Sequence, residues 1–248
     1  NMDAGYAFPD GLDHAKGRLY HGTFLSHFSF FAWKFPSWLM EIASRCPYQD
    51  VRREIIHDCV DEEVADDEAD GLCHLDLLYE EVEACGIPRA QVAALEPTPV
   101  VLACVHALEN FSRTLSWQGA YAAMAALELG STKQAVELRK KLLSEKQLAA
   151  GMTGRDSASL SERTGLPAEK MRFASHHAYK DQFHGGGELK LLIKYGTSRE
   201  IQEEMLWAAK ASVDTFCVMR QSIDVMARAA VGLGPREVAN VEAGTRAA

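Results

Sequence analysis

Apolar residues recur at helical spacing along most of the chain. In residues 48–70, for example, the apolar positions follow one another at the intervals that place them on one side of a helix: Val51, Ile55, Ile56, Cys59, Val60 and Val64. Strand-like alternation of apolar and polar residues is almost absent from the sequence. The pattern therefore predicts an all-α fold.

Glycine, proline and polar stretches divide this pattern into helices. The predicted helical segments are 20–46, 48–70, 74–85, 100–115, 116–150, 167–184 and 198–231. Residues 151–162 read as a polar connection. Pro36 should interrupt or kink the first helix, and the three consecutive glycines at 185–187 should weaken or break the sixth.

The chain of 248 residues is long enough to bury one substantial core. We expect a flexible arm at 1–18, a single helical domain at 19–232 and a flexible tail at 233–248. Aromatic residues crowd the segment from Phe24 to Trp38, where they would fill the core or wall an apolar substrate pocket. Residues 119–129 are apolar nearly all round, so this helix should be buried.

The composition of the chain argues against several classes of protein. The 35 acidic against 26 basic residues, a net charge of -9, argue against nucleic-acid binding, which needs clustered cations. No apolar run is long enough to cross a membrane and no leader-like start is present, so we expect a soluble, cytoplasmic protein. The six cysteines form no paired motif and read as reduced, mostly buried thiols.

The chemistry concentrates in one helical stretch, where His177, Asp181 and His184 share a face. At about 100° per residue, Asp181 and His184 lie roughly 40° and 20° to either side of His177. Two imidazoles and a carboxylate on one face are ligands for a first-row transition metal. The alternative is a polar helix face on which Asp181 only pairs with a histidine.

Three further positions complete a candidate ligand set. Residues 61–70 hold seven acids, including Glu62 and Glu63, and His74 follows them. The repulsion within such a run would be relieved in part by a bound dication. Glu128 lies in the apolar helix, where a buried carboxylate needs a cation, a hydrogen-bond network or a proton.

The candidate ligands are thus three imidazoles and three carboxylates, enough for two metal ions: Glu62 (or Glu63), His74, Glu128, His177, Asp181 and His184. Oxygen and imidazole donors favour iron or manganese over structural zinc. A ferritin-like bundle would need two Glu-x-x-His pairs, and the sequence offers only Glu54 and His57.

The order of these motifs resembles the haem-oxygenase-like diiron oxidases, most closely those of the CADD-like kind. The resemblance rests on Asp61-Glu62-Glu63 before His74, on Glu128 in an Ala-rich helix, and on the His177-x3-Asp181-x2-His184 motif. It covers roughly residues 20–230. The interval between Glu62 and His74 is longer than in the family pattern, which leaves the choice between Glu62 and Glu63 open.

The resemblance implies a seven-helix bundle that binds two Fe(II) ions at these six residues and activates O2. Family members desaturate, cleave, cyclise or N-oxygenate small molecules in natural-product biosynthesis. A general similarity to azetidine-forming isoleucine oxidases of polyoxin biosynthesis favours a free aliphatic amino acid as substrate, which would be desaturated or closed into a ring through a C–N bond. Such an enzyme would also need an external electron donor. The sequence does not decide whether the chain forms a homodimer.

Three alternatives remain at this point. The same ligands would serve an N-oxygenase of an amine or amino acid, or an enzyme that cleaves C–C bonds or decarboxylates its substrate. A metal-free helical binding protein is the alternative of another class, in which the six residues do not meet. A thiaminase-like hydrolase would need a nucleophilic cysteine near paired carboxylates, and none stands out in the sequence.

Overall fold

The computed structural model describes residues 8–129 and 157–235, apart from the side chains of residues 68, 129, 157–159, 174–175 and 177–186. Within these ranges the chain is helical, and its only β-type pairing is an isolated bridge between Asp66 and Leu72. The all-α prediction is confirmed. The helices are α1 (His14–Arg45), α2 (Gln49–Glu63), α3 (His74–Ala84), α4 (Arg89–Ala93), α5 (Pro99–Thr114), α6 (Trp117–Leu129), α9 (Ser157–Thr164), α10 (Arg172–Tyr195) and α11 (Arg199–Ala230), with 3-10 turns η2 (Asp67–Ala69) and η3 (Ala168–Lys170).

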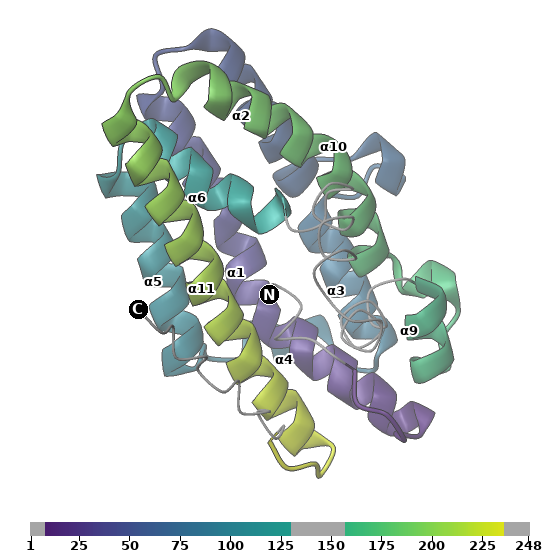
Figure 1. Ribbon diagram of the computed structural model, residues 1–248. Coiled ribbons are helices and arrows are strands. Elements are labelled where there is room, and N and C mark those ends of the chain that lie inside the picture. Colours follow the sequence, from purple (N-terminus) through teal and green to yellow (C-terminus); the bar gives the residue numbers. More distant parts are fainter. Residues whose placement is uncertain (1–7, 130–156, 236–248) are drawn as a thin grey trace, which may run out of the picture.

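Helix α1 runs through the middle of the bundle and packs against α2, α3, α5, α6, α9 and α11 (Figure 1). It begins at His14, before the expected start at residue 20, because the Asp13 side chain accepts a hydrogen bond from the Lys16 amide at 2.9 Å. Residues 14–18 therefore belong to this helix and not to the arm that we expected. Pro36 lies inside α1 and does not end it.

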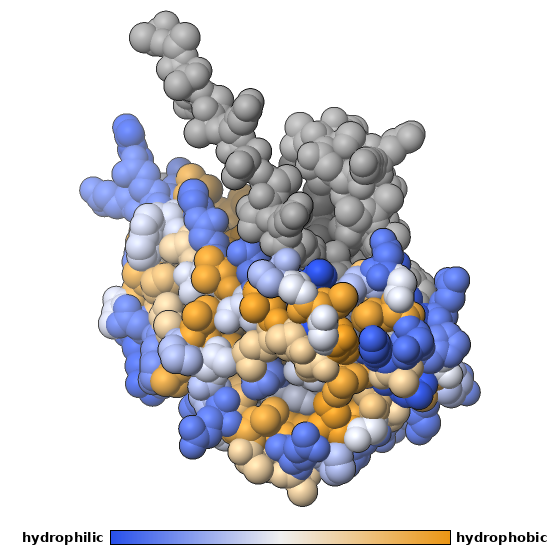
Figure 2. Space-filling model, turned by 90° about the horizontal axis from the view of Figure 1, so that it is seen from below, coloured by the Kyte–Doolittle hydropathy of each residue, from blue (hydrophilic) through white to orange (hydrophobic). Residues whose placement is uncertain are grey.

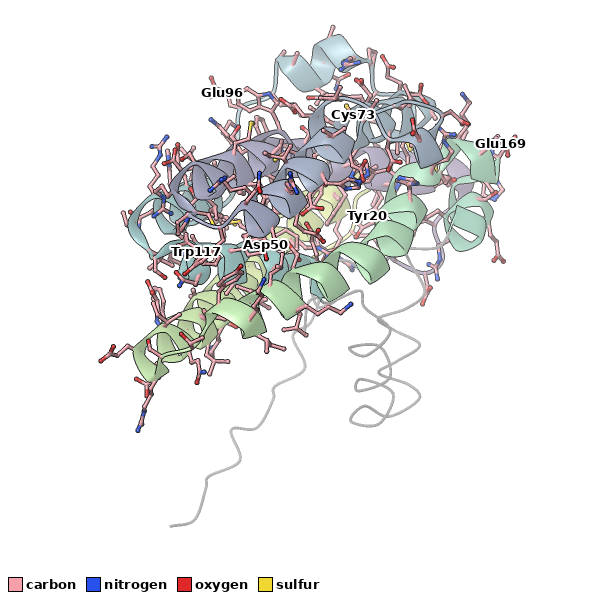
Figure 3. The ribbon with its side chains drawn as sticks, turned by 90° about the horizontal axis from the view of Figure 1, so that it is seen from above. Tyr20, Asp50, Cys73, Glu96, Trp117 and Glu169 are labelled. Carbon is pink, nitrogen blue, oxygen red and sulfur yellow. The ribbon has the colours of Figure 1, made fainter. Side chains whose placement is uncertain are left out.

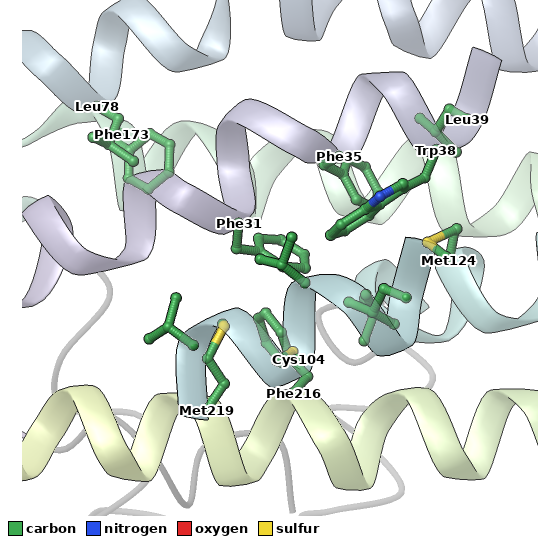
Figure 4. Packing of buried hydrophobic residues seen from close by; sticks show 14 of the residues in the cluster. Phe31, Phe35, Trp38, Leu39, Leu78, Cys104, Met124, Phe173, Phe216 and Met219 are labelled. Atoms are coloured by element: carbon green, nitrogen blue, oxygen red, sulfur yellow. The ribbon is translucent and has the colours of Figure 1, made fainter. Parts of the chain in front are cut away.

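The aromatic residues of α1 form the centre of the core. Phe31 lies 4.8 Å from Phe216 of α11 between ring centroids and 5.6 Å from both Phe35 and Trp38 (Figure 4). All four rings are buried. For these residues the structure supports core packing, whereas Trp33 is 55% exposed and belongs to neither a core nor an enclosed pocket.

Two predicted segments differ from the structure. Helix α2 ends at Glu63, so the second half of the acidic run forms a tight loop in which Asp70 and Gly71 both adopt positive φ. Residues 157–164, expected in part to be a polar connection, form α9. The boundaries of α3, α5 and α11 agree with the prediction to within a few residues, α10 begins at Arg172 and not at residue 167, and the second half of the helix predicted over 116–150 lies outside the described residues.

The expected break at the three glycines is wrong, because α10 continues through residues 185–187 to Tyr195. Gly187 faces α2 at close range: the Glu54 carboxylate occupies the place that a β-carbon on residue 187 would need. Glycine weakens a helix by about 1 kcal/mol relative to alanine. Here its small size lets a carboxylate of α2 approach the backbone of α10.

The surface mixes charged and apolar side chains. On the face shown in Figure 2, apolar patches alternate with strongly hydrophilic residues, and the chain's exposed large apolar residues include Ile193, Leu206 and Trp207. A search of the described residues for a helix with the length and hydrophobicity of a membrane span gave no candidate.

Gly17 provides a test of how α9 packs on α1. A β-carbon on residue 17 would collide with the backbone carbonyl of Arg163, which cannot rotate away as a side chain can. We expect Gly17→Ala to lower the free energy of unfolding by about 1–3 kcal/mol through overpacking. Urea denaturation measures the change. Gly234→Ala is the control, because nothing lies near its added methyl group, and an equal loss in both variants would contradict this packing.

Candidate metal centre

His74 lies between two carboxylates at the start of α3. Its Nδ1 is 2.9 Å from Glu62 Oε1, and its Nε2 is 3.1 Å from Asp66 Oδ2. Asp66 Oδ2 is also 2.6 Å from His176 Nε2 of α10. One donor atom each from Asp66, His74 and His176 therefore lie within 4.8 Å of one another, which is the spacing of ligands around a metal ion.

Backbone bonds of the α2–α3 loop hold Asp66 in place. The Asp66 amide donates to the Leu72 carbonyl at 3.1 Å, and the Asp66 carbonyl accepts from both the Ala69 and the Gly71 amides at 2.9 Å. The Asp66 side chain is 1% exposed. The loop thus presents a buried carboxylate whose position is set by main-chain hydrogen bonds.

The start of α10 is tied to α3 and α1 through Glu81. Its Oε2 accepts a hydrogen bond from the Phe173 amide at 2.8 Å, and its Oε1 lies 2.5 Å from His21 Nε2. Both side chains of this pair are 1% exposed. A buried charge-assisted contact of this kind fixes the first turn of α10, and with it the position of His176 three residues later.

The electrostatics of His74 follow from these contacts. Burial alone would lower the pKa of His74, but Glu62 and Asp66 on its two ring nitrogens outweigh burial and raise it to about 9. Without a metal, a proton on each nitrogen satisfies both carboxylates. A dication bound at Nε2 would replace one of these protons, while Glu62 would still accept from Nδ1 and fix the ring.

A second group of acidic side chains lies beside the first, between α2, α6 and α10. Burial, together with the neighbouring carboxylates of Glu54, Glu62 and Asp61, raises the pKa of Asp58 to about 8. The nearby His74 acts in the opposite direction. Asp58 therefore connects the His74 group electrostatically with the carboxylates that lie further along α2.

Tyr121 of α6 marks where the three helices meet. Its side chain is fully buried, and its pKa is raised first by burial and then by carboxylates from α10, α2 and α6: Glu188, Asp58, Glu128 and Glu54. We call these four acids the carboxylate cluster. Their shared influence on one phenol places them around it, although they come from distant parts of the sequence.

Of the six predicted ligands, the structure describes the side chains of three. Glu62 and His74 are in direct contact, and Glu128 is buried in the carboxylate cluster at 8% exposure. His177, Asp181 and His184 lie on α10, but their side chains are outside the described residues. Glu63, the alternative to Glu62, is exposed.

The backbone of α10 nevertheless relates this trio to the cluster. Glu188 follows His177 by three helical turns, so at about 100° per residue it lies within roughly 20° of His177 around the helix axis. Glu188 is 0% exposed and belongs to the carboxylate cluster. The helix face that carries His177, Asp181 and His184 is therefore the one that continues into Glu188.

Sequence reasoning missed several residues of this region. Glu188 was detectable, since extending the helical face of His177 by three turns reaches it. Asp66 stood in the acidic run, but only the loop distinguishes it from its exposed neighbour Asp67. His176 was passed over in favour of His177, and Tyr121 looked like one more apolar position of a buried helix.

The Glu54 and His57 side chains, like the cations Arg53 and Arg172, lie in different environments. His57 is exposed although Glu54 points towards α10, so the two do not share a site. Arg172 pairs with Asp70 at 2.5 Å, and Arg53 is exposed. Lys180 lies outside the described side chains.

The five buried cysteines do not supply a nucleophile. None of the six cysteines forms a disulfide bond. Burial is the main cause that raises the pKa of Cys59, Cys85 and Cys104 to about 12 and also raises the pKa of Cys46 and Cys73. These five thiols are protonated at neutral pH and therefore unreactive.

Comparison with known proteins now adds to this geometry. Residues 22–216 match the family model described as iron-containing redox enzymes. The chain belongs to this family. The match spans every helix that contributes to the centre, from α1 to α10, and the donors found here are imidazoles and carboxylates, which suit iron.

Solved structures support the fold. A domain of unknown function with a haem-oxygenase-like fold from Shewanella denitrificans superimposes with a TM-score of 0.61 at 11% identity, covering 83% of this chain and 78% of its own. A TenA homologue from Pseudomonas syringae pv. tomato gives 0.60 at 15% identity, covering 90% and 87%. These likenesses confirm the predicted haem-oxygenase-like bundle. A comparison with curated proteins finds no match.

The raised pKa values of Asp58 and His74 predict how stability depends on pH in the metal-free protein. Both groups hold their protons more tightly in the folded chain than in the unfolded one, so folding is favoured at low pH and less so as pH rises towards 8 and 9. We expect the free energy of unfolding to fall by on the order of 1–3 kcal/mol between about pH 6 and pH 9.

Urea denaturation of the metal-free protein across this range measures the effect. Asp58→Asn should reduce the decline, because an amide cannot lose the proton, whereas Asp67→Asn, at an exposed position, should leave it unchanged. A stability that rises with pH would contradict the assignment of both groups.

Proposed function

We propose that this iron-containing redox enzyme is a diiron oxidase that uses O2 to oxidise a small free aliphatic amino acid. The observation that carries the proposal is the convergence of Asp66, His74 and His176 donor atoms within 4.8 Å in a chain of this family. Their atoms and the carboxylate cluster fit iron, because hard oxygen and imidazole donors are those it prefers.

Several residues would hold the metal. His74 would bind through Nε2, with Glu62 on Nδ1 either as a ligand or as the carboxylate that orients the ring. Glu128 would bind from α6, and His177, Asp181 and His184 would bind from α10. Asp66 and His176, which are both shielded from solvent, would add two further ligands.

The metal, when bound, supplies the electrons that reduce O2, and the protein's residues do the rest. Buried acids on three helices would hold the ions at fixed positions, since main-chain bonds and the Glu81 contacts secure the loop and α10. The tightly packed rings of α1 and α11 exclude water from one side of the region. An external donor is needed to return the irons to the reduced state.

The substrate is the part that rests on resemblance. An aliphatic amino acid of the isoleucine or valine type would lose hydrogen from a C–H bond, giving an alkene or, after C–N bond formation, a ring. The runner-up reactions, N-oxygenation of an amine and oxidative C–C cleavage or decarboxylation, use the same ligands. They differ in product, so product analysis separates them.

The metal site itself is tested by iron binding. Protein loaded anaerobically with Fe(II) should hold two ions per chain, and His74→Ala should reduce this number. Glu62→Gln should weaken affinity by about 10–100-fold if Glu62 orients the ring. His57→Ala, an exposed histidine of the same helix, is the matched control. Absence of binding in the unaltered protein would favour the metal-free binding protein.

The reaction is tested by exposing the Fe(II)-loaded protein to O2 with a panel of amino acids. We expect O2 consumption and a transient visible band whose decay is accelerated by the true substrate. His184→Ala should abolish turnover and keep the helix content measured by circular dichroism. Near-normal turnover of that variant would remove His184 from the site, and consumption of none of the aliphatic amino acids would exclude the proposed substrate class.

A further inference from the structure

A series of tyrosine and tryptophan rings connects the carboxylate cluster with the surface. The inner end is Tyr121, which is 0% exposed. Among the described residues its hydroxyl group has no hydrogen-bond partner, although four carboxylates influence it. Ionised carboxylates near a phenol make it easier to oxidise, because negative charge stabilises the positive charge left by a departing electron.

The next ring outward is Trp117, one helical turn before Tyr121 on α6. Residues four apart on a helix have β-carbons about 5–6 Å from each other. The Trp117 ring lies 5.7 Å from Tyr48 and 5.8 Å from Tyr195 between centroids, and these two tyrosines stack at 3.9 Å. Tyr48 is 41% exposed, so the series reaches solvent.

The outer end also has a proton acceptor. The Tyr195 hydroxyl donates to the Asp50 carboxylate, with both oxygens at 2.9 Å, and Lys194 donates to the same carboxylate at 2.7 Å. Figure 3 labels Trp117 and Asp50 next to each other. A tyrosine that loses an electron must also lose its phenol proton, and Asp50 lies where that proton would go.

The aromatic core on α1 makes a useful contrast. Phe31 and Phe35 contact Trp38, Phe31 also packs on Phe216, and phenylalanine is far harder to oxidise than tyrosine or tryptophan. The oxidisable rings are thus continuous along α6 and interrupted along α1. Packing alone requires large apolar rings in both places and does not require this difference.

We propose that Tyr121, Trp117 and the Tyr48–Tyr195 pair form a path for single electrons between the metal site and the surface. The proposal rests on the proposed O2 chemistry and adds a function to the same region. The path would discharge an oxidising equivalent that is produced when no substrate is in place.

The electrons and protons balance along this path. The oxidising equivalent takes one electron from Tyr121, and the phenol proton passes to a carboxylate of the cluster, which has to turn into hydrogen-bond distance because the hydroxyl has no partner among the described residues. Trp117 then gives an electron to Tyr121, which regains its proton, and Tyr195 gives an electron to Trp117 as its own proton passes to Asp50. A small one-electron reductant in solution, such as ascorbate, finally reduces Tyr195, and the proton returns from Asp50.

The first test uses Fe(II)-loaded protein exposed to O2 without substrate, followed by electron paramagnetic resonance and peptide mapping. We expect a tyrosyl radical signal and oxidation products on Tyr48 and Tyr195. Trp117→Phe keeps a ring in place but removes the oxidisable member, so products at the surface pair should be lost and damage should accumulate at Tyr121. Trp207→Phe is the control, because Trp207 packs on Phe111 away from this series.

A second test needs neither metal nor O2. Photo-oxidised tris(bipyridine)ruthenium, with persulfate as the terminal oxidant, should oxidise the exposed tyrosine pair of the metal-free protein, and the radical should then reach buried Tyr121. Trp117→Phe should abolish oxidation of Tyr121, while Trp207→Phe should not. Tyr121 oxidation that is equal in all three proteins would overturn the path, and circular dichroism establishes that both variants fold.

The two tests separate the proposals. Failure to bind iron or to consume O2 would reject the proposed function, whereas the photochemical result decides the path independently. A path that operates in the metal-free protein supports the inference even where the substrate class proves wrong. Surface products in iron-loaded Trp117→Phe protein that match the unaltered protein would reject it.

Discussion

Buried negative charge is the constraint on which the rest of this structure depends. Acidic side chains from α2, α6 and α10 meet in the interior, where an isolated carboxylate would cost several kcal/mol. Contacts with imidazoles offset part of this cost, and protons on groups such as Asp58 offset another part by neutralising the charge. Metal ions would meet it more fully, which explains why a chain of an iron-containing redox family concentrates acids in its core.

The fold separates an apolar core from the region that holds the buried acids. On one side, α1 and α11 bring phenylalanine rings together in a dry core of the ordinary kind. On the other side, α2, α6 and α10 enclose the acids, and small residues let these helices approach: Ala120, Ala123 and Ala125 of α6 are fully buried, and Gly187 of α10 admits Glu54. The same bundle therefore supplies both a hydrophobic framework and a polar centre.

The sequence predicted the helical elements well because their signals are local. Helical spacing, the proline before α5 and the glycine after α3 lie within a few residues of the boundaries they mark. It predicted Glu128 as a buried carboxylate for the same reason, since Glu128 stands in an apolar helix, and the structure confirms its burial. The predictions for His177, Asp181 and His184 stay predictions, because their side chains lie outside the described residues.

What could not be predicted depends on tertiary contacts. Nothing near Gly187 in the sequence reveals that Glu54 will lie against it, so the three glycines looked like a helix end. Asp66 differs from the other acids of its run only through the positive φ of Asp70 and Gly71, which turn the loop back on itself. The aromatic series from Tyr121 to Tyr48 joins three helices and has no sequence motif of its own.

The loop between α2 and α3 has one more consequence. Three main-chain hydrogen bonds hold Asp66 in place before any ion binds. Its backbone therefore loses little conformational entropy when the carboxylate binds an ion. Lengthening or shortening this connection by a single amino acid would rotate the carboxylate away from the imidazoles while leaving every helix intact. The connection thus acts as a spacer whose length in this chain sets the position of the carboxylate.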